Sequence, residues 1–219
     1  MYSSFSPGFF DRVDENDDAN FYSIPRLVVH IDKYAIAQIG KILGEVLPLN
    51  PRILDLLSSW RSHLPPRLTK CHMVGLGMNF LEMSENPALN SYVVQNVNKN
   101  STLPFEDETF DAVLLTVSVQ YIVRPIEVFR EVNRVLTENG AFIVTFSNRM
   151  FPTKAIKAWQ LYTDQQRMTL IKFYLQKAGG YKGIIAEDRS PNLGYYTDPV
   201  YLVIARKDSR EPTRVDPGT

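Results

Sequence analysis

The clearest pattern of apolar and polar positions lies in the segment Leu103–Asn148. Two continuous apolar runs, Ala112–Val119 and Ala141–Phe146, have the length of buried strands. Between them, Pro125–Leu136 repeats its apolar residues at helical spacing and carries charged residues on the opposite face. Both runs are too apolar for a sheet with one solvated face, so the pattern predicts a buried parallel β-α-β unit.

Weaker patterns predict further elements along the chain. Asp32 and Asp164 are suited to begin the helices that follow them, and Pro65-Pro66 shortens the helix before it. The predicted strands are Arg52–Leu57, Cys71–Leu76, Ser91–Val97, Lys182–Glu187 and Val200–Arg206. The predicted helices are Lys33–Val46, a short Ser59–Leu64, one that starts near Phe80 after an Asn79 cap, Thr153–Leu161 and Asp164–Lys177.

The first unit also carries a specific motif. LPF-x-D-x-x-FDAV, followed by E-V-x-R-V-L-x-x-x-G, resembles the fourth- and fifth-strand signature of class I S-adenosylmethionine-dependent methyltransferases of the broad type 11 group. The similarity extends more loosely over residues 50–206. It implies a Rossmann-like α/β fold, with helices on both faces of a mostly parallel seven-stranded sheet. The implied strand order is 3-2-1-4-5-7-6, with the last strand antiparallel. The implied cofactor is S-adenosylmethionine.

The turn after the first predicted strand differs from the family pattern hhDxGxGxG. Glycines there let the backbone adopt positive φ and approach the methionine part of the cofactor. In this chain Leu57, Ser59 and Arg61 occupy the three glycine positions. Two interpretations are open. Either Ser58 and Ser59 replace the glycine contacts and Trp60 packs beside the ligand, or the site has decayed and the fold serves as an inactive scaffold or regulatory protein.

Two further positions where the family has carboxylates also differ. Gly77 stands where an acid binds the ribose, so Asn79 or Glu82 are the alternatives. After the third strand, Asn96 or Asn98 is the nearest match to the residue beside the adenine amine, and an amide can both donate and accept there. The resemblance thus implies a cofactor site of Asp55, Ser58, Ser59, Asn79, Asn96 and Val117.

A catalytic residue is harder to name. Methyl transfer from a sulfonium mainly requires alignment, and an oxygen or nitrogen nucleophile can also need a base. Three residues are candidates: Tyr121 after the fourth strand, Asn148 after the fifth, and His30 before the helix Lys33–Val46. Each also has a structural explanation. Tyr121 can pack under the next helix, Asn148 can belong to an ordinary connecting loop, and His30 can form local hydrogen bonds.

Length and charge limit the remaining options. The chain of 219 residues predicts one domain, here 32–207, with an N-terminal arm or lid at 1–31 and a disordered tail at 208–219. With 24 Lys plus Arg against 24 Asp plus Glu, no overall charge attracts nucleic acid or a membrane, so a small-molecule acceptor is expected. The single Cys71 leaves no disulfide, and no metal site is expected. No signal peptide or membrane span is visible, which favours a cytoplasmic protein whose oligomeric state is open.

Overall fold

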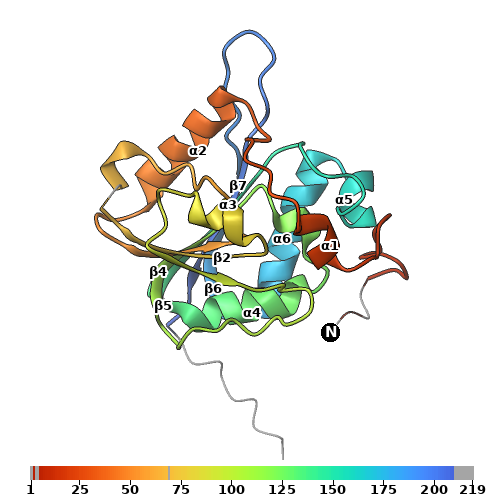
Figure 1. Ribbon diagram of the computed structural model, residues 1–219, viewed down its shortest axis with the longest axis horizontal. Coiled ribbons are helices and arrows are strands. Elements are labelled where there is room, and N and C mark those ends of the chain that lie inside the picture. The colour runs from red at the N-terminus through yellow and green to blue at the C-terminus, as the bar shows by residue number, and fades with distance from the viewer. Residues whose placement is uncertain (1, 3–4, 69, 210–219) are drawn as a thin grey trace, which may run out of the picture.

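The computed structural model describes residues 2, 5–68 and 70–209, so most of the predicted tail lies outside the described residues. Their strands form one sheet in the order β3-β2-β1-β4-β5-β7-β6 (Figure 1). All neighbours from β3 to β5 are parallel, and β7 runs antiparallel to both β5 and β6. The predicted order and the antiparallel last strand are therefore confirmed. The strands are β1 (Arg52–Leu56), β2 (His72–Gly77), β3 (Ser91–Val94), β4 (Phe110–Thr116), β5 (Leu136–Phe146), β6 (Tyr181–Asp188) and β7 (Tyr201–Lys207).

Helices cover both faces of this sheet. The α-helices of the described residues are α1 (Asp18–Tyr22), α2 (Lys33–Val46), α3 (Phe80–Ser84), α4 (Pro125–Val135), α5 (Lys157–Leu161) and α6 (Asp164–Ala178). Successive strand residues point to opposite faces. Leu54 and Leu56 therefore belong to the core under α4, α5 and α6, whereas Ile53, just before them, belongs to the core under α2. None of the helices in the described part of the chain is long and apolar enough to cross a membrane.

The predicted helix Ser59–Leu64 is wrong. The chain between β1 and β2 is irregular and holds only a 3-10 turn at Pro66–Leu68. The hydroxyls of Ser58 and Ser62 both donate to the carboxylate of Asp55, which holds the segment against the end of β1. A left-handed φ of 54° at His63 and the two prolines after it then prevent a helical turn.

Two other boundaries also need correction. The helix predicted to start at Thr153 starts at Lys157, because residues 153–156 form turns. The cap of α6 is Thr163 and not Asp164, since the Thr163 side chain accepts the backbone N–H of Gln166 and the Gln166 side chain accepts that of Thr163. This reciprocal arrangement is a capping box, which satisfies two free N–H groups at once.

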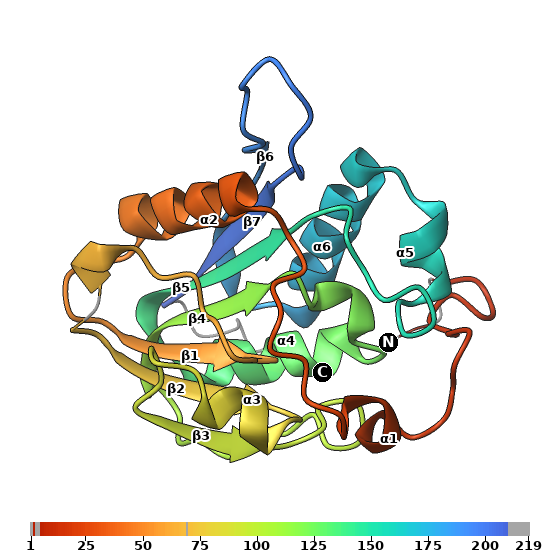
Figure 2. The same cartoon turned by 45° about the horizontal axis from the view of Figure 1, so that its top comes forward.

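The N-terminal segment packs on the domain. The rings of Phe5, Phe9 and Phe10 lie against one another and against Tyr174 of α6 or Tyr162. Figure 2 shows the connection from α1 to α2 running across the tips of β1 and β4. The N-terminal residues therefore cover the carboxyl ends of the central strands.

Candidate functional site

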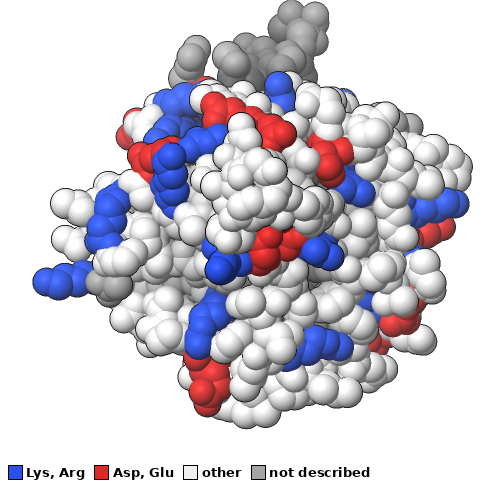
Figure 3. Space-filling view, turned by 90° about the horizontal axis from the view of Figure 1, so that it is seen from above, with Lys and Arg blue, Asp and Glu red and all other residues white. Residues whose placement is uncertain are grey.

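A pocket of about 280 Å³ lies between the carboxyl ends of the strands and the N-terminal segment. Residues that follow β1, β2, β3, β4 and β5 all contribute to its wall, and so do residues of α1 and of the connection to α2. This edge is where open α/β sheets bind ligands. Figure 3 views the molecule from above and shows positive and negative side chains interspersed over the face turned to the viewer.

Asp55 at the end of β1 is an enclosed carboxylate of the pocket, only 4% exposed. Its Oδ2 accepts the hydroxyl of Ser58 at 2.7 Å and that of Ser62 at 2.6 Å. Burial raises the pKa of Asp55, because the charged form loses solvation, although the two hydroxyl bonds oppose this. Asn86 completes the cluster by donating to the Ser62 hydroxyl and to the Ser59 carbonyl. The cluster fixes the glycine-poor turn.

The backbone of this turn keeps a conformation that glycine usually supplies. Leu57, at the first glycine position of the family pattern, has φ of 58°. On the neighbouring strand end Val117 has φ of 50°, which is rare for a β-branched residue. Both line the pocket. Strained backbone of this kind concentrates at ligand sites, where the surrounding structure holds it in place.

Gly77 at the end of β2 explains why the family's ribose acid is absent. A Cβ built on Gly77 would lie 2.3 Å from the carbonyl oxygen of Ser58, so no side chain fits there. A carboxylate enters the pocket instead from α3. Glu82 is 7% exposed and accepts the Ser59 hydroxyl at 2.6 Å and the backbone N–H of Arg26 at 2.7 Å.

Three amides complete this side of the pocket. Asn79 caps α3 through its Oδ1 and donates from Nδ2 to the carbonyl of Tyr22, 2.8 Å away. The Oδ1 of Asn96 accepts the backbone N–H of Asn98 in a tight turn. Asn98 donates to Asp18 and to the Tyr121 carbonyl, so it holds α1 against the end of β4. The predicted cofactor-site residues therefore all line one pocket.

The other side of the pocket is aromatic and is centred on Phe151. The ring of Tyr121 stacks on Phe151 at 5.8 Å, and the rings of Phe21 and His30 meet it edge-on at 5.3 and 4.9 Å. The Tyr121 hydroxyl accepts the backbone N–H of Phe151 at 2.8 Å. Burial raises the pKa of Tyr121. Loss of solvent, followed by the charge of Arg26, lowers the pKa of His30.

The three catalytic candidates are thus not brought together. Tyr121 and His30 line the pocket and share Phe151 as a neighbour. Asn148 is exposed and does not line it.

Sequence reasoning missed several residues that shape the site. Phe151 and Ser62 were seen only as parts of a loop and of a polar run, and the contacts of Arg26 and Tyr22 depend on the path of the N-terminal segment. The hydroxyl of Ser118 lines the pocket at 8% exposure and has no hydrogen-bond partner among the described residues. A polar residue directly after a buried strand was the one available signal for Ser118.

The polar groups present fit S-adenosylmethionine. Each carboxylate oxygen of Glu82 has a second lone pair for a ribose hydroxyl. The Nδ2 of Asn96 makes no hydrogen bond within the described residues and is available to an adenine edge. Leu57 and Trp60 line the pocket and do not fill it, and its volume is near the lower end for small-molecule sites. The described residues contain no cluster of three or more His, Cys, Asp or Glu that could hold a metal ion.

Comparisons with known proteins agree with this geometry. Residues 63–144 match the family model described as a methyltransferase domain. None of the curated proteins matches the chain.

Solved structures share the fold at low sequence identity. A possible histamine N-methyltransferase from Thermotoga maritima aligns with a TM-score of 0.56 and 16% identity, over 80% of this chain and 89% of that one. An S-adenosylmethionine-dependent methyltransferase from Methanosarcina mazei aligns with a TM-score of 0.53 and 15% identity, over 76% and 97%. The [4+2]-cyclase SpnF aligns with a TM-score of 0.57 and 16% identity, over 78% and 81%.

Residues 63–144 thus match a methyltransferase domain, and the chain has the fold of the class I S-adenosylmethionine-dependent methyltransferases, a family whose cofactor is S-adenosylmethionine.

Proposed function

We propose that the protein binds S-adenosylmethionine in the pocket at the ends of β1 to β4 and methylates a small molecule. The observation that carries this proposal is the open pocket itself. Its wall holds Glu82, whose carboxylate enters where the ribose acid of the family is missing. An inactive scaffold is disfavoured because the pocket is not plugged by the side chains that replaced glycine.

Each part of the proposed cofactor site has its own task. Glu82 binds the ribose hydroxyls, and Asn96 reads the adenine edge. Asp55, with its two serine hydroxyls, fixes the turn whose backbone faces the methionine part. When bound, the cofactor supplies an electrophilic methyl group. The protein then has to hold the acceptor in line with it and exclude water.

The acceptor lies against the aromatic side of the pocket in this proposal. His30 is the better of the two bases there, because its lowered pKa keeps the imidazole neutral near pH 7. Tyr121 holds its proton, since its pKa is raised, and orients the acceptor through its hydroxyl.

The N-terminal segment acts as a lid over both ligands. Several hydrogen bonds attach it to the pocket rim, and three of them involve residues 22–28. The Trp60 Nε1 donates to the Val28 carbonyl at 2.9 Å, the Asn79 amide to the Tyr22 carbonyl, and the Arg26 N–H to Glu82. Each involves a single polar group of the lid, so the part of the lid at residues 22–28 can open by breaking few bonds while α1 stays attached.

Thermal unfolding with S-adenosylhomocysteine tests this function. Ligand at about 100 times its dissociation constant adds about 2.7 kcal/mol of stability, which raises the melting temperature by several degrees. Glu82→Gln retains the shape of the side chain but weakens the acceptor for the ribose, so we expect a smaller shift. Arg52→Gln, at the opposite end of β1, is the control and leaves the shift unchanged. Absence of any shift in the wild-type protein at millimolar ligand would reject the proposal.

A further inference from the structure

We propose that the methyl acceptor is an organic anion and that Arg26 binds its carboxylate or other oxyanion group. This inference rests on the proposed function, because it names the acceptor class for the same pocket. It follows from the way Arg26 is held, from the charge balance of the pocket wall, and from the groups beside it.

The Arg26 side chain is held by aromatic and carbonyl contacts. Its guanidinium carbon lies 4.4 Å from the centroid of the Phe21 ring and 5.4 Å from that of Phe151. One terminal nitrogen donates to the Phe21 carbonyl at 3.0 Å, and the other to the Ile24 carbonyl at 3.3 Å. These bonds use two of the five guanidinium N–H groups. The remaining three are oriented by a stacked, partly buried side chain, so little entropy is lost when an oxyanion binds.

The guanidinium of Arg26 has no direct carboxylate partner among the described residues, although the carboxylate of Glu82 lies in the same pocket wall. Among the ion pairs of the described residues, Arg26 takes part in none. The carboxylate of Asp18 is paired with Arg12 at 2.7 Å and Lys154 at 3.1 Å, and Arg149 pairs with Asp198 at 2.8 Å. Glu82 accepts the Arg26 backbone N–H but not its guanidinium.

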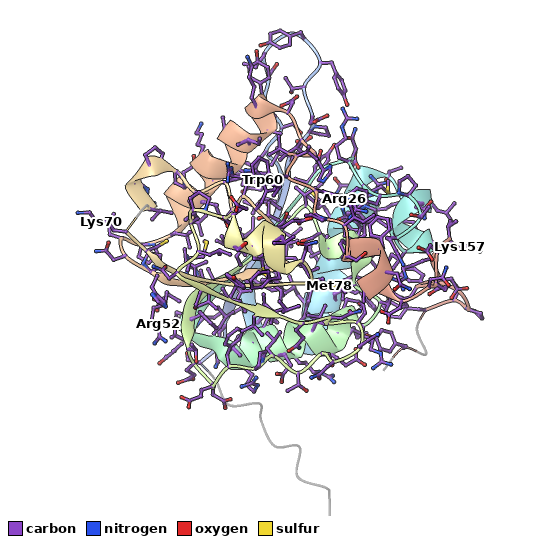
Figure 4. All side chains as sticks on the ribbon, viewed as in Figure 1. Arg26, Arg52, Trp60, Lys70, Met78 and Lys157 are labelled. Atoms are coloured by element: carbon purple, nitrogen blue, oxygen red, sulfur yellow. The ribbon has the colours of Figure 1, made fainter. Side chains whose placement is uncertain are left out.

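Arg61 is the other pocket guanidinium without a carboxylate partner, and its position differs. It is exposed at the rim, where it lies 3.9 Å from the Trp60 ring centroid and donates to the carbonyls of Trp60 and Glu85. Arg26 is on the Phe151 side, where the acceptor is placed. Figure 4 shows the labelled Arg26 and Trp60 close together at the strand-end side of the molecule.

The surroundings of Arg26 suit the rest of such a molecule. The rings of Tyr121 and Phe151 form an apolar wall, and the unpartnered hydroxyl of Ser118 lies in the same pocket. A ligand with an apolar body and one anionic group would cover the rings, pair with the guanidinium and offer a partner to that hydroxyl. A neutral ligand of the same shape would leave the guanidinium without a counterion as the lid excludes water.

Calorimetric titration of the protein saturated with S-adenosylhomocysteine tests the inference. Benzoate and benzamide are the probes, since they have the same ring and differ in charge, and phenyl phosphate separates phosphate from carboxylate recognition. We expect at least about tenfold tighter binding of benzoate than of benzamide. Arg26→Gln should reduce this ratio to about one, and Arg26→Lys should leave part of it.

Arg52→Gln is the matched control, because it removes the same charge from an exposed residue at the far end of β1 (Figure 4). It should retain the full benzoate preference. Equal binding of benzoate and benzamide by the wild-type protein would overturn the inference. So would an equal loss of the benzoate preference in Arg26→Gln and Arg52→Gln. So would a loss of S-adenosylhomocysteine binding in Arg26→Gln with the benzoate preference intact, since Arg26 would then serve the cofactor. The melting shift with S-adenosylhomocysteine reports separately on the proposed function.

Discussion

At the scale of single residues, the pocket wall contains non-glycine residues whose backbone is in the left-handed region. Leu57, His63 and Val117 all have positive φ and all line it. Left-handed backbone costs a non-glycine residue of order 1–3 kcal/mol and persists only when neighbouring contacts enforce it. Here the enforcing contacts at β1 are the hydroxyl bonds to Asp55.

Substitutions at Leu57 should reveal this strain. Both Leu57→Gly and Leu57→Ala lose side-chain packing, but only glycine relieves the left-handed backbone. We expect Leu57→Gly to be more stable than Leu57→Ala by about 1 kcal/mol in urea unfolding, the reverse of the usual order in a strand. At Leu56, which is fully buried in regular β1, glycine should be the worse of the two substitutions. If the glycine and alanine variants had the same order of stability at Leu57 and at Leu56, the backbone at Leu57 would not be strained.

His63 should make stability depend on pH. Burial, and then the charge of Arg61, lowers the pKa of His63 from 6.5 to about 4. Between these values the unfolded chain binds a proton that the folded chain does not, so stability falls as pH falls from 6.5 to 4. At pH 4.5 the loss relative to pH 7 should be on the order of 2–3 kcal/mol.

His63→Asn tolerates positive φ and cannot titrate, so it serves as the comparison. The unfolding free energy of both proteins is measured at pH 7 and at pH 4.5. The decrease between the two pH values should be smaller in the variant by about the 2–3 kcal/mol that His63 contributes. Parallel pH curves would show that His63 is not held neutral.

At the scale of elements, an irregular segment and a lid replace one helix and one glycine turn. The loop between β1 and β2 carries Ser58, Ser59, Ser62 and His63, each of which has a role at the pocket or behind it. In a regular helix these side chains would point in different directions around the helix axis. The irregular backbone between β1 and β2 instead places them near the carboxyl end of β1. The lid forms a hydrogen bond to one residue of this segment, since the Trp60 Nε1 donates to the Val28 carbonyl.

Asn79→Asp should loosen the lid without unwinding α3. An aspartate oxygen still caps the helix, but the donor to the Tyr22 carbonyl is lost. Amide hydrogen exchange in residues 22–31 should become faster, with α3 unchanged. Asn90→Asp makes the same replacement at an exposed site, where only the side-chain oxygen forms a hydrogen bond, as acceptor of the Met73 backbone N–H. This variant should have no effect on the lid. Unchanged exchange in Asn79→Asp would mean that this bond does not hold the lid.

The predictive power of the sequence also differs by element. The apolar runs in Leu103–Asn148 predict β4, α4 and β5, because buried parallel strands carry a strong local signal. The strand order came instead from the family resemblance that the motif in this segment carries. The helix at Ser59–Leu64 failed because hydroxyl bonds to Asp55 outweigh local propensity. The lid contacts were not predictable, since Arg26 and Glu82 are 56 residues apart and meet through one backbone N–H.

At the scale of the whole molecule, one buried lysine adds a charged anchor to the hydrogen bonds and ring contacts that attach the N-terminal segment to the domain. Lys154, between β5 and α5, is fully buried and contacts the carboxylates of Asp14 and Asp18 and the carbonyls of Asp14 and Asn16. The cation therefore neutralises two acidic residues of the segment that the sequence alone left as an arm or a lid.

Lys154→Met should destabilise the protein as a whole. Removing the cation leaves Asp18 enclosed with only Arg12 as a charged partner, and loss of one member of a buried pair costs about 3–5 kcal/mol. Lys157→Met removes the same charge from an exposed position and should change stability by less than about 0.5 kcal/mol. Chemical denaturation of the three proteins measures both values, and similar values for the two variants would argue against the buried anchor.

The contact between Gly77 and the Ser58 carbonyl makes two sequence changes inseparable. Compared with the family pattern of glycines after the first strand and an acid after the second, this chain has side chains in the turn and glycine at position 77, and the turn passes directly over Gly77. Reverting either position by itself should produce a collision or a gap. An engineered acid at position 77 therefore requires a turn after β1 in which the Ser58 carbonyl is moved away.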